Sequence, residues 1–166
     1  DRIKVESYQM CVDIAAGGSA WHPDSRAGRT HSLPFCVATA LANASISYSD
    51  FDDQPAEYSK VFKLMSKVNV AEDLQMTAEF PQNSPCKITI VLNDGSKISA
   101  SRDYPHGDAK DPMTNAEIEE KLLNYFFFSE GNEAKEVLDQ LYNIEGITSV
   151  SKITKPLKRR RINSKK

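Results

Sequence analysis

Residues 86–102 read CKITIVLNDGSKISASR, and this stretch decides the fold that the sequence predicts. Apolar and polar residues alternate over Cys86–Leu92, as they do in a half-buried β-strand. Residues Asn93–Ser96 (NDGS) then predict a tight hairpin turn, in which Gly95 can adopt a positive φ. The buried face is expected to hold Cys86, Ile88, Ile90 and Leu92 from the first strand, and Ile98 and Ala100 from the partner strand Lys97–Arg102.

Upstream of the hairpin, the sequence predicts one strand and two helical segments. Residues 2–13 predict a strand with a bulge near Glu6–Ser7, because the apolar alternation slips there. A loop over 15–29 precedes Ser32, the expected N-cap of a buried helix over 33–42 with Pro34 in its first turn. Ser49 and the aspartates after it indicate either a second helix start or a short helical turn, and helical spacing of apolar residues continues over 56–68.

Downstream of the hairpin, two further helices are predicted. Thr114–Glu117 (TNAE) is a capping box, which starts a helix whose apolar stripe is Ile118, Leu122, Tyr125 and Phe126. Gly131 interrupts, and a second stripe follows at Ala134, Val137, Leu138, Leu141 and Tyr142. Gly146 ends this helix, and residues 147–153 are expected to form a short final strand.

This order of elements predicts an α+β domain, an antiparallel sheet with helices packed on one side. We expect the domain to span residues 1–155 and a disordered basic tail to span 156–166. The chain begins at Asp1 rather than Met, and we expect it to be a piece of a larger protein.

Composition sets broad limits on the class of protein. The 166 residues suffice for one domain with a real core, and 40% hydrophobic with 27% charged residues is normal for a globular protein. The sequence has no apolar run of membrane-spanning length and does not open with a signal peptide. Three cysteines without a CxxC pair predict reduced thiols in a cytosol-like compartment, and the spacing of the three histidines predicts no metal site.

The net charge of −2 hides an asymmetry. From Val150 onward there are eight basic residues and no acidic ones, which leaves 13 basic against 23 acidic residues in the rest of the chain. A short basic tract can bind nucleic acid, but here no aromatic residues interleave with it and the body is acidic. Nucleic acid is therefore not an expected partner.

Two loops hold the residues that could carry chemistry. The first is 21–35, WHPDSRAGRTHSLPF, in which His31 lies just before a helix N-terminus and Arg26 or Arg29 could bind a carboxylate with two hydrogen bonds. The simpler alternative is a loop histidine with one hydrogen bond beside solvated arginines. The second loop is 104–114, YPHGDAKDPMT, in which Lys110 is a candidate functional residue. The alternative is that this loop is only an ordered connector.

Both loops carry motifs of a known family. The first motif is W-x-P-x-x-R followed by H-S-L-P-aromatic, and the second is Y-P-x-G-x-x-x-x-P-M-T, with the strand hairpin and its Asp94-Gly95 between them. With these elements in this order, the chain from about residue 3 to 153 resembles the C-terminal part of the MmgE/PrpD family. That family includes 2-methylcitrate dehydratase, cis-aconitate decarboxylase and iminodisuccinate epimerase.

The resemblance implies the lid domain of a two-domain, metal-free lyase that acts on a small di- or tricarboxylate without a cofactor. A larger helical domain, absent from this chain, would complete the site, so the chain alone is expected to be inactive. The resemblance further implies a homodimer, no membrane partner, a role such as propionate metabolism, and a cytoplasmic location, or a mitochondrial one in a eukaryote. Two distant loops would converge on the organic acid.

Within this resemblance, His31 is the expected catalytic residue, as a proton-transfer or orienting group. Arg26, Ser32, Phe35 and Lys110 are the expected substrate-binding residues. The chain departs from the family pattern at three positions: Thr30 and Phe35 stand where the family often has Asp and Tyr, and Asp108 where a His is common. The alternative to an enzyme domain is a non-catalytic α+β module that uses its aromatic helix and basic tail for assembly.

Overall fold

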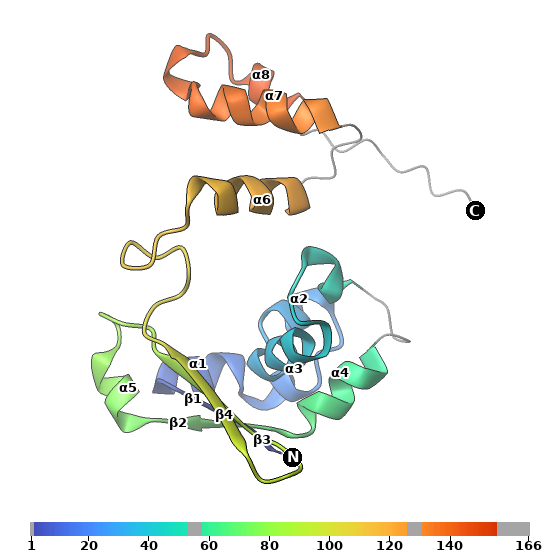
Figure 1. Cartoon of the computed structure of the whole chain (residues 1–166), viewed down its shortest axis with the longest axis vertical. Helices are drawn as coiled ribbons and strands as arrows, with labels where there is room; N and C mark the ends of the chain where they lie inside the picture. Colours follow the sequence, from blue (N-terminus) through green and yellow to red (C-terminus); the bar gives the residue numbers. More distant parts are fainter. Residues whose placement is uncertain (1, 53–57, 126–130, 156–166) are drawn as a thin grey trace, which may run out of the picture. The chain divides into compact units, whose positions relative to one another are not determined.

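A computed structural model of the chain describes residues 2–52, 58–125 and 131–155. The chain forms two compact units, unit 1 (Asp1–Pro112) and unit 2 (Met113–Lys166) (Figure 1). The four strands found among the described residues all lie in unit 1, whereas the described part of unit 2 is helical. The expected division at residue 155 stays a prediction, and the expected tail at 156–166 lies outside the described residues.

The sheet of unit 1 confirms the α+β class but is mixed rather than purely antiparallel. Its strands are β1 (Arg2–Ser7), β2 (Val68–Glu72), β3 (Cys86–Val91) and β4 (Lys97–Arg102), in the order β2-β1-β3-β4. The pairs β1–β3 and β3–β4 are antiparallel, whereas β1 and β2 are parallel. The sequence analysis missed β2, because residues 56–68 read as one helix that ran up to its first residue.

One face of this sheet forms the core of unit 1. Ile3 and Val5 of β1 lie buried beside Val68, and α3 (Leu33–Asn43) covers them with Val37. A second cluster joins α3 to α4 (Tyr58–Met65), and its buried members are Phe35, Ala38, Tyr58, Val61 and Met65. Trp21 packs against both clusters, so the indole links the sheet side of α3 to its other side.

The predicted hairpin is confirmed, but the predicted burial of its second strand is wrong. Gly95 has φ of +83°, and β3 and β4 pair on either side of the turn. Every residue of β4 is exposed, and Ile98 is 57% exposed. β4 lies at the edge of the sheet, beyond the strands that α3 covers, so alternation alone overestimated its burial.

The predicted first strand is wrong beyond Ser7. Helix α1 (Gln9–Ala15) follows β1, and Tyr8 between them stacks on Phe80 with ring centroids 4.4 Å apart. A short apolar run fits a period of 2 and a period of 3.6 almost equally well, which explains the error. The predicted loop over 15–29 contains two short helical turns, η1 (Gly18–Trp21) and α2 (Arg26–Thr30).

The other helix predictions for unit 1 are confirmed in outline. Ser32 caps α3, and Pro34 lies in its first turn. The segment after Ser47 is the short helical turn η2 (Tyr48–Phe51), capped by Asp50, and α4 follows. The last helix of the unit, α5 (Leu74–Glu79), which Asp73 caps, was not predicted.

In unit 2, the helices α6 (Asn115–Tyr125) and α7 (Gly131–Tyr142) are confirmed. The capping box is present, since Thr114 N donates to Glu117 Oε2 at 2.7 Å and Glu117 N donates to Thr114 Oγ1 at 3.3 Å. The predicted final strand over 147–153 is wrong: α8 (Ser151–Thr154), which buries Ile153, forms there, after the short turn η3 (Ile144–Gly146). None of the described helices combines the length and apolar character that a membrane span requires.

Candidate functional site

The first predicted loop is shaped by two successive helix caps. Ser25 Oγ accepts a hydrogen bond from Gly28 N at 3.1 Å, which starts α2. Ser32 is fully buried; its Oγ accepts from Phe35 N at 3.1 Å and donates to Ala20 O at 2.5 Å. Ser32 therefore starts α3 and ties it to η1, and substrate contact by its hydroxyl stays a prediction.

His31 lies between these two helices, with its side chain exposed. Its Nδ1 lies 2.8 Å from Ala27 O and 3.2 Å from Thr30 Oγ1. A carbonyl oxygen can only accept, so Nδ1 carries the proton in this bond. In the neutral form of the ring, Nε2 is then the nitrogen without a proton, and it has no partner among the residues that the structure describes. The main chain thus fixes the tautomer and leaves a lone pair open to a ligand.

Arg26 is half-buried, and its guanidinium already has partners. Its NH1 forms an ion pair with Asp52, and its NH2 donates to Tyr48 O at 3.0 Å. The guanidinium carbon lies 3.7 Å from the centroid of the Tyr48 ring. Arg26 is therefore held in one orientation, with a carboxylate of the same chain bound to it.

Arg29, the second candidate for carboxylate binding, lies inside the protein. It is 4% exposed, its Nε donates to Phe51 O at 3.0 Å, and its guanidinium carbon lies 5.3 Å from the centroid of the Tyr58 ring. These contacts join α2 to η2 and α4. Of the two arginines, Arg26 is the one within reach of a ligand.

Phe35 is also inside the protein. Its side chain is fully buried, and its ring meets that of Tyr58 edge to face, with centroids 5.3 Å apart. The rings of Phe51 and Phe62 lie 6.2 and 6.1 Å away. The structure therefore gives Phe35 a packing role, and its contact with a substrate stays a prediction.

The second predicted loop holds Lys110 in place without a carboxylate. Lys110 Nζ donates to Gln82 O at 3.1 Å and Asn83 Oδ1 at 3.3 Å, and it lies 4.5 Å from the centroid of the Tyr104 ring. An open hollow of about 580 Å³ adjoins it. Among the described residues, the partners of the Lys110 ammonium group are all neutral.

A shared carboxylate organises the rest of this loop. Asp111 Oδ2 accepts from Arg102 NH1 at 2.5 Å and lies 3.4 Å from His106 Nδ1. Asp108, at a position where the family often has His, accepts instead from Lys110 N at 2.8 Å. No sequence pattern indicates the pairing of Arg102 with Asp111, since the two residues lie nine positions apart and outside any common helix.

The predicted site residues of the two loops do not contact one another. In the described structure, Arg26 bonds to residues of η2, whereas Lys110 bonds to residues 82–83 and 104. The hollow beside Lys110 is lined by residues 100–104, 110 and 111, which include none from the first loop. Convergence of both loops on one organic acid therefore stays a prediction.

The three cysteines are free. Burial raises the pKa of the Cys36 thiol, and burial together with the nearby Cys11 raises that of Cys86. These two thiols are therefore poor nucleophiles at neutral pH. Within the described ranges, no three His, Cys, Asp or Glu side chains cluster as ligands of a metal ion would.

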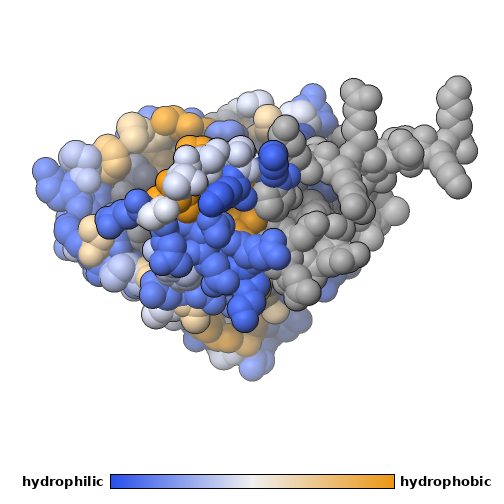
Figure 2. All heavy atoms as spheres, turned by 90° about the horizontal axis from the view of Figure 1, so that it is seen from above, coloured by the Kyte–Doolittle hydropathy of each residue, from blue (hydrophilic) through white to orange (hydrophobic). Residues whose placement is uncertain are grey.

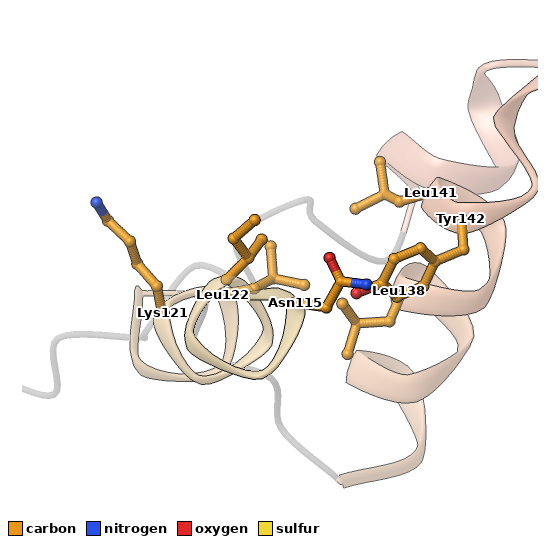
Figure 3. A pocket seen from close by; sticks show the side chains of 7 residues that line it. Asn115, Lys121, Leu122, Leu138, Leu141 and Tyr142 are labelled. Carbon is orange, nitrogen blue, oxygen red and sulfur yellow. The ribbon is translucent and has the colours of Figure 1, made fainter. Parts of the chain in front are cut away.

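Unit 2 contains an apolar groove that the sequence analysis did not predict. It has a volume of about 480 Å³ between α6 and α7 (Figure 3), and its lining residues are Asn115, Ile118, Lys121, Leu122, Leu138, Leu141 and Tyr142. Ile118 and Tyr142 are about half exposed. Figure 2 shows hydrophobic residues at the surface among hydrophilic ones. The apolar stripes of α6 and α7 could have indicated this groove. A stripe alone, however, does not show whether another element covers it.

Comparison with known proteins gives one family and several relatives. The model of the MmgE/PrpD C-terminal domain matches residues 1–143. Cis-aconitate decarboxylase of Aspergillus terreus is 28% identical over 144 residues, which cover 79% of this chain and 28% of that enzyme. The same enzyme of Mus musculus is 26% identical over 106 residues (60% of this chain, 20% of the enzyme). The 2-methylcitrate dehydratase of Escherichia coli K12 is 25% identical over 116 residues (66% and 23%). The chain thus spans less than a third of the length of these curated relatives.

Proposed function

Since the chain belongs to the MmgE/PrpD family, through the C-terminal domain of that family, we propose that it forms part of a lyase for a small di- or tricarboxylate. Dehydration of a 2-methylcitrate-like acid is the first proposed reaction, and decarboxylation of a cis-aconitate-like acid or an epimerisation comes next. The support is the family match and the names of the relatives.

The observation that carries this proposal is the exposed Nε2 of His31. The Nδ1–H bond to Ala27 O holds the ring, so Nε2 presents a lone pair in a fixed direction. In a dehydration, a base takes the proton from the carbon next to the carboxylate, and the C–O bond breaks on the neighbouring carbon. The leaving hydroxyl takes up a proton from an acid of the helical domain and departs as water. His31 Nε2 is the proposed proton acceptor in this step.

Nearby cations stabilise the negative charge that builds up beside the carboxylate in such a step. Arg26 is the proposed carboxylate contact, and Lys110 contributes its charge from the second loop. Ser32 and Phe35 are buried, and they act by holding α3 and the loop that carries His31. The exposure of the side chains supports this division of roles. His31 and Arg26 are partly exposed, and hydrogen bonds to the main chain hold each of them in one orientation.

We further propose how this domain is used in the complete enzyme. This unit is the lid over a helical domain, the chain alone is inactive, and the complete enzyme is a homodimer that needs neither metal nor cofactor. A reducing compartment, cytoplasmic or mitochondrial, suits the three free thiols.

The experiment is a set of substitutions in a full-length family enzyme that carries this domain. His31→Ala should lower turnover at least about tenfold, which is the low end of general acid–base effects. His31→Asn keeps a donor for Ala27 O but has no lone pair at the Nε2 position, so it should lose as much. His22→Ala, on the same loop and exposed, is the matched control and should stay within about twofold. Unchanged kinetics for both His31 variants would reject the role.

A second candidate function is the non-catalytic assembly module, and the apolar groove between α6 and α7 favours it. An exposed groove of this kind is typical of a protein-binding surface. Light scattering on the chain separates the outcomes: a stable complex or oligomer that Leu138→Glu dissolves would support assembly. A folded monomer would count against it.

A further inference from the structure

Arg26 binds a carboxylate from its own chain in the position where the proposed function needs a carboxylate of the substrate. We propose that Asp52 is an internal stand-in for the substrate: it occupies Arg26 in the free protein and gives way when an organic acid binds. This inference rests on the proposed function, and it adds Asp52 as a residue that sets the affinity and Tyr48 as a positioning residue.

The contacts around Arg26 divide into a fixed set and an exchangeable one. The Tyr48 ring lies 3.7 Å from the guanidinium carbon, and Tyr48 O accepts from NH2 at 3.0 Å. A ring and a carbonyl oxygen orient the planar guanidinium but bring no negative charge. The charge comes from Asp52 at NH1, which is where a carboxylate of another molecule would bind.

The Asp52 side chain can leave without dismantling the turn that carries it. The cap of η2 is made by Asp50, whose Oδ2 accepts from Ser47 N at 2.6 Å and from Ser47 Oγ at 2.8 Å. Tyr58 OH donates to the main-chain oxygens of Asp50 and Asp52, so the backbone stays anchored. Only the rotation of one side chain is then needed to free Arg26.

The exposure of the Arg26–Asp52 pair indicates that an external carboxylate can replace Asp52 at little cost in free energy. The side chains of Arg26 and Asp52 are 34% and 45% exposed, and ion pairs with this degree of exposure are weak. If Asp52 leaves Arg26 free for roughly a tenth to a third of the time, the affinity for an external carboxylate falls to that same fraction of its value for an unoccupied Arg26. Removal of the Asp52 charge should therefore tighten binding about 3–10-fold.

The test is a titration of the full 166-residue chain with citrate, followed by NMR through the Nε–H signal of Arg26 at constant ionic strength. Asp52→Asn should bind citrate about 3–10-fold more tightly than the unmodified chain. Asp52→Ser, which is too short to reach the guanidinium, should do so as well. Asp24→Asn removes one exposed carboxylate from the same loop without touching Arg26, and it should stay within about twofold. Arg26→Gln removes the reporting signal, so its citrate binding is measured by isothermal titration calorimetry beside the unmodified chain, and it should be abolished.

Three results would overturn the inference. They are equal affinity in the unmodified and Asp52 variants, citrate binding that survives Arg26→Gln, and no response of Arg26 to citrate in either Asp52 variant. Each of these outcomes concerns Asp52 and Arg26 alone. The proposed function is judged by the turnover of the His31 variants, so the two can fail separately.

Discussion

Replacement of Ser32 by alanine should destabilise unit 1 strongly, because one buried hydroxyl makes two hydrogen bonds. Loss of the bond from Phe35 N removes a helix N-cap, which costs about 1 kcal/mol. Loss of the bond to Ala20 O leaves a buried carbonyl without that partner, at a cost of about 1–3 kcal/mol. Ser32→Ala should therefore lower the free energy of unfolding by roughly 2–4 kcal/mol.

Urea unfolding followed by tryptophan fluorescence measures this loss. Trp21 is the single tryptophan and packs against both clusters of unit 1, so its emission reports the unfolding of that unit. With a slope of about 2 kcal/mol per molar urea, the midpoint should fall by about 1–2 M. Ser32→Gly separates the two bonds: glycine at an N-cap costs only a few tenths of a kcal/mol, so this variant should lose mainly the bond to Ala20 O. A loss below about 0.5 kcal/mol for Ser32→Ala would refute the assigned role, since this is less than a typical cap contributes.

Three further outcomes are expected. Gly95→Ala should cost about 1–2 kcal/mol in the same urea assay, because φ of +83° strains a residue with a Cβ although the space around it is open; Gly95→Asn should cost less, and equal losses would contradict this. With the other two cysteines changed to serine, Cys36 should react with a thiol reagent more slowly when folded than in urea, because burial raises the pKa of its thiol; equal rates would contradict burial. The hydrogen bond from Tyr142 to Glu119 raises the pKa of Tyr142, so its titration, followed by NMR, should shift to lower pH in Glu119→Gln. This bond stabilises the fold below the usual tyrosine range and is lost as pH rises through the raised value; an unchanged titration would count against it.

Sequence predicts well those features that neighbouring residues determine. The cap at Ser32 and the turn at Gly95 depend on side chains within a few positions of each other, and both are confirmed. The capping box at Thr114 is of the same kind. In each case the hydrogen-bond partners lie within four residues, so the pattern contains the whole interaction.

The errors arise where distant residues decide. Tyr8 lies between the first strand and α1, and its ring stacks on that of Phe80, 72 positions away, a contact that no local pattern contains. Ile98 is exposed because of the position of β4 at the sheet edge, which depends on the order of all four strands. The burial of Phe35 and the pairing of Arg26 with Asp52 are decided by η2 and α4 in the same way. Thus the candidate residues could be named from the sequence, but their partners could not.

The neighbour of His31 affects what the imidazole can do. The family that the chain resembles often has an aspartate at the position of Thr30. A carboxylate there would orient the imidazole ring of the histidine and favour its charged form. Here Thr30 Oγ1 donates to Ala27 O at 2.9 Å, the same oxygen that accepts from His31. A hydroxyl brings no charge, so the orientation of the ring depends on a main-chain carbonyl at the end of α2 instead. This arrangement leaves Nε2 with its lone pair, which suits a group that accepts a proton from the substrate better than one that donates a proton to it.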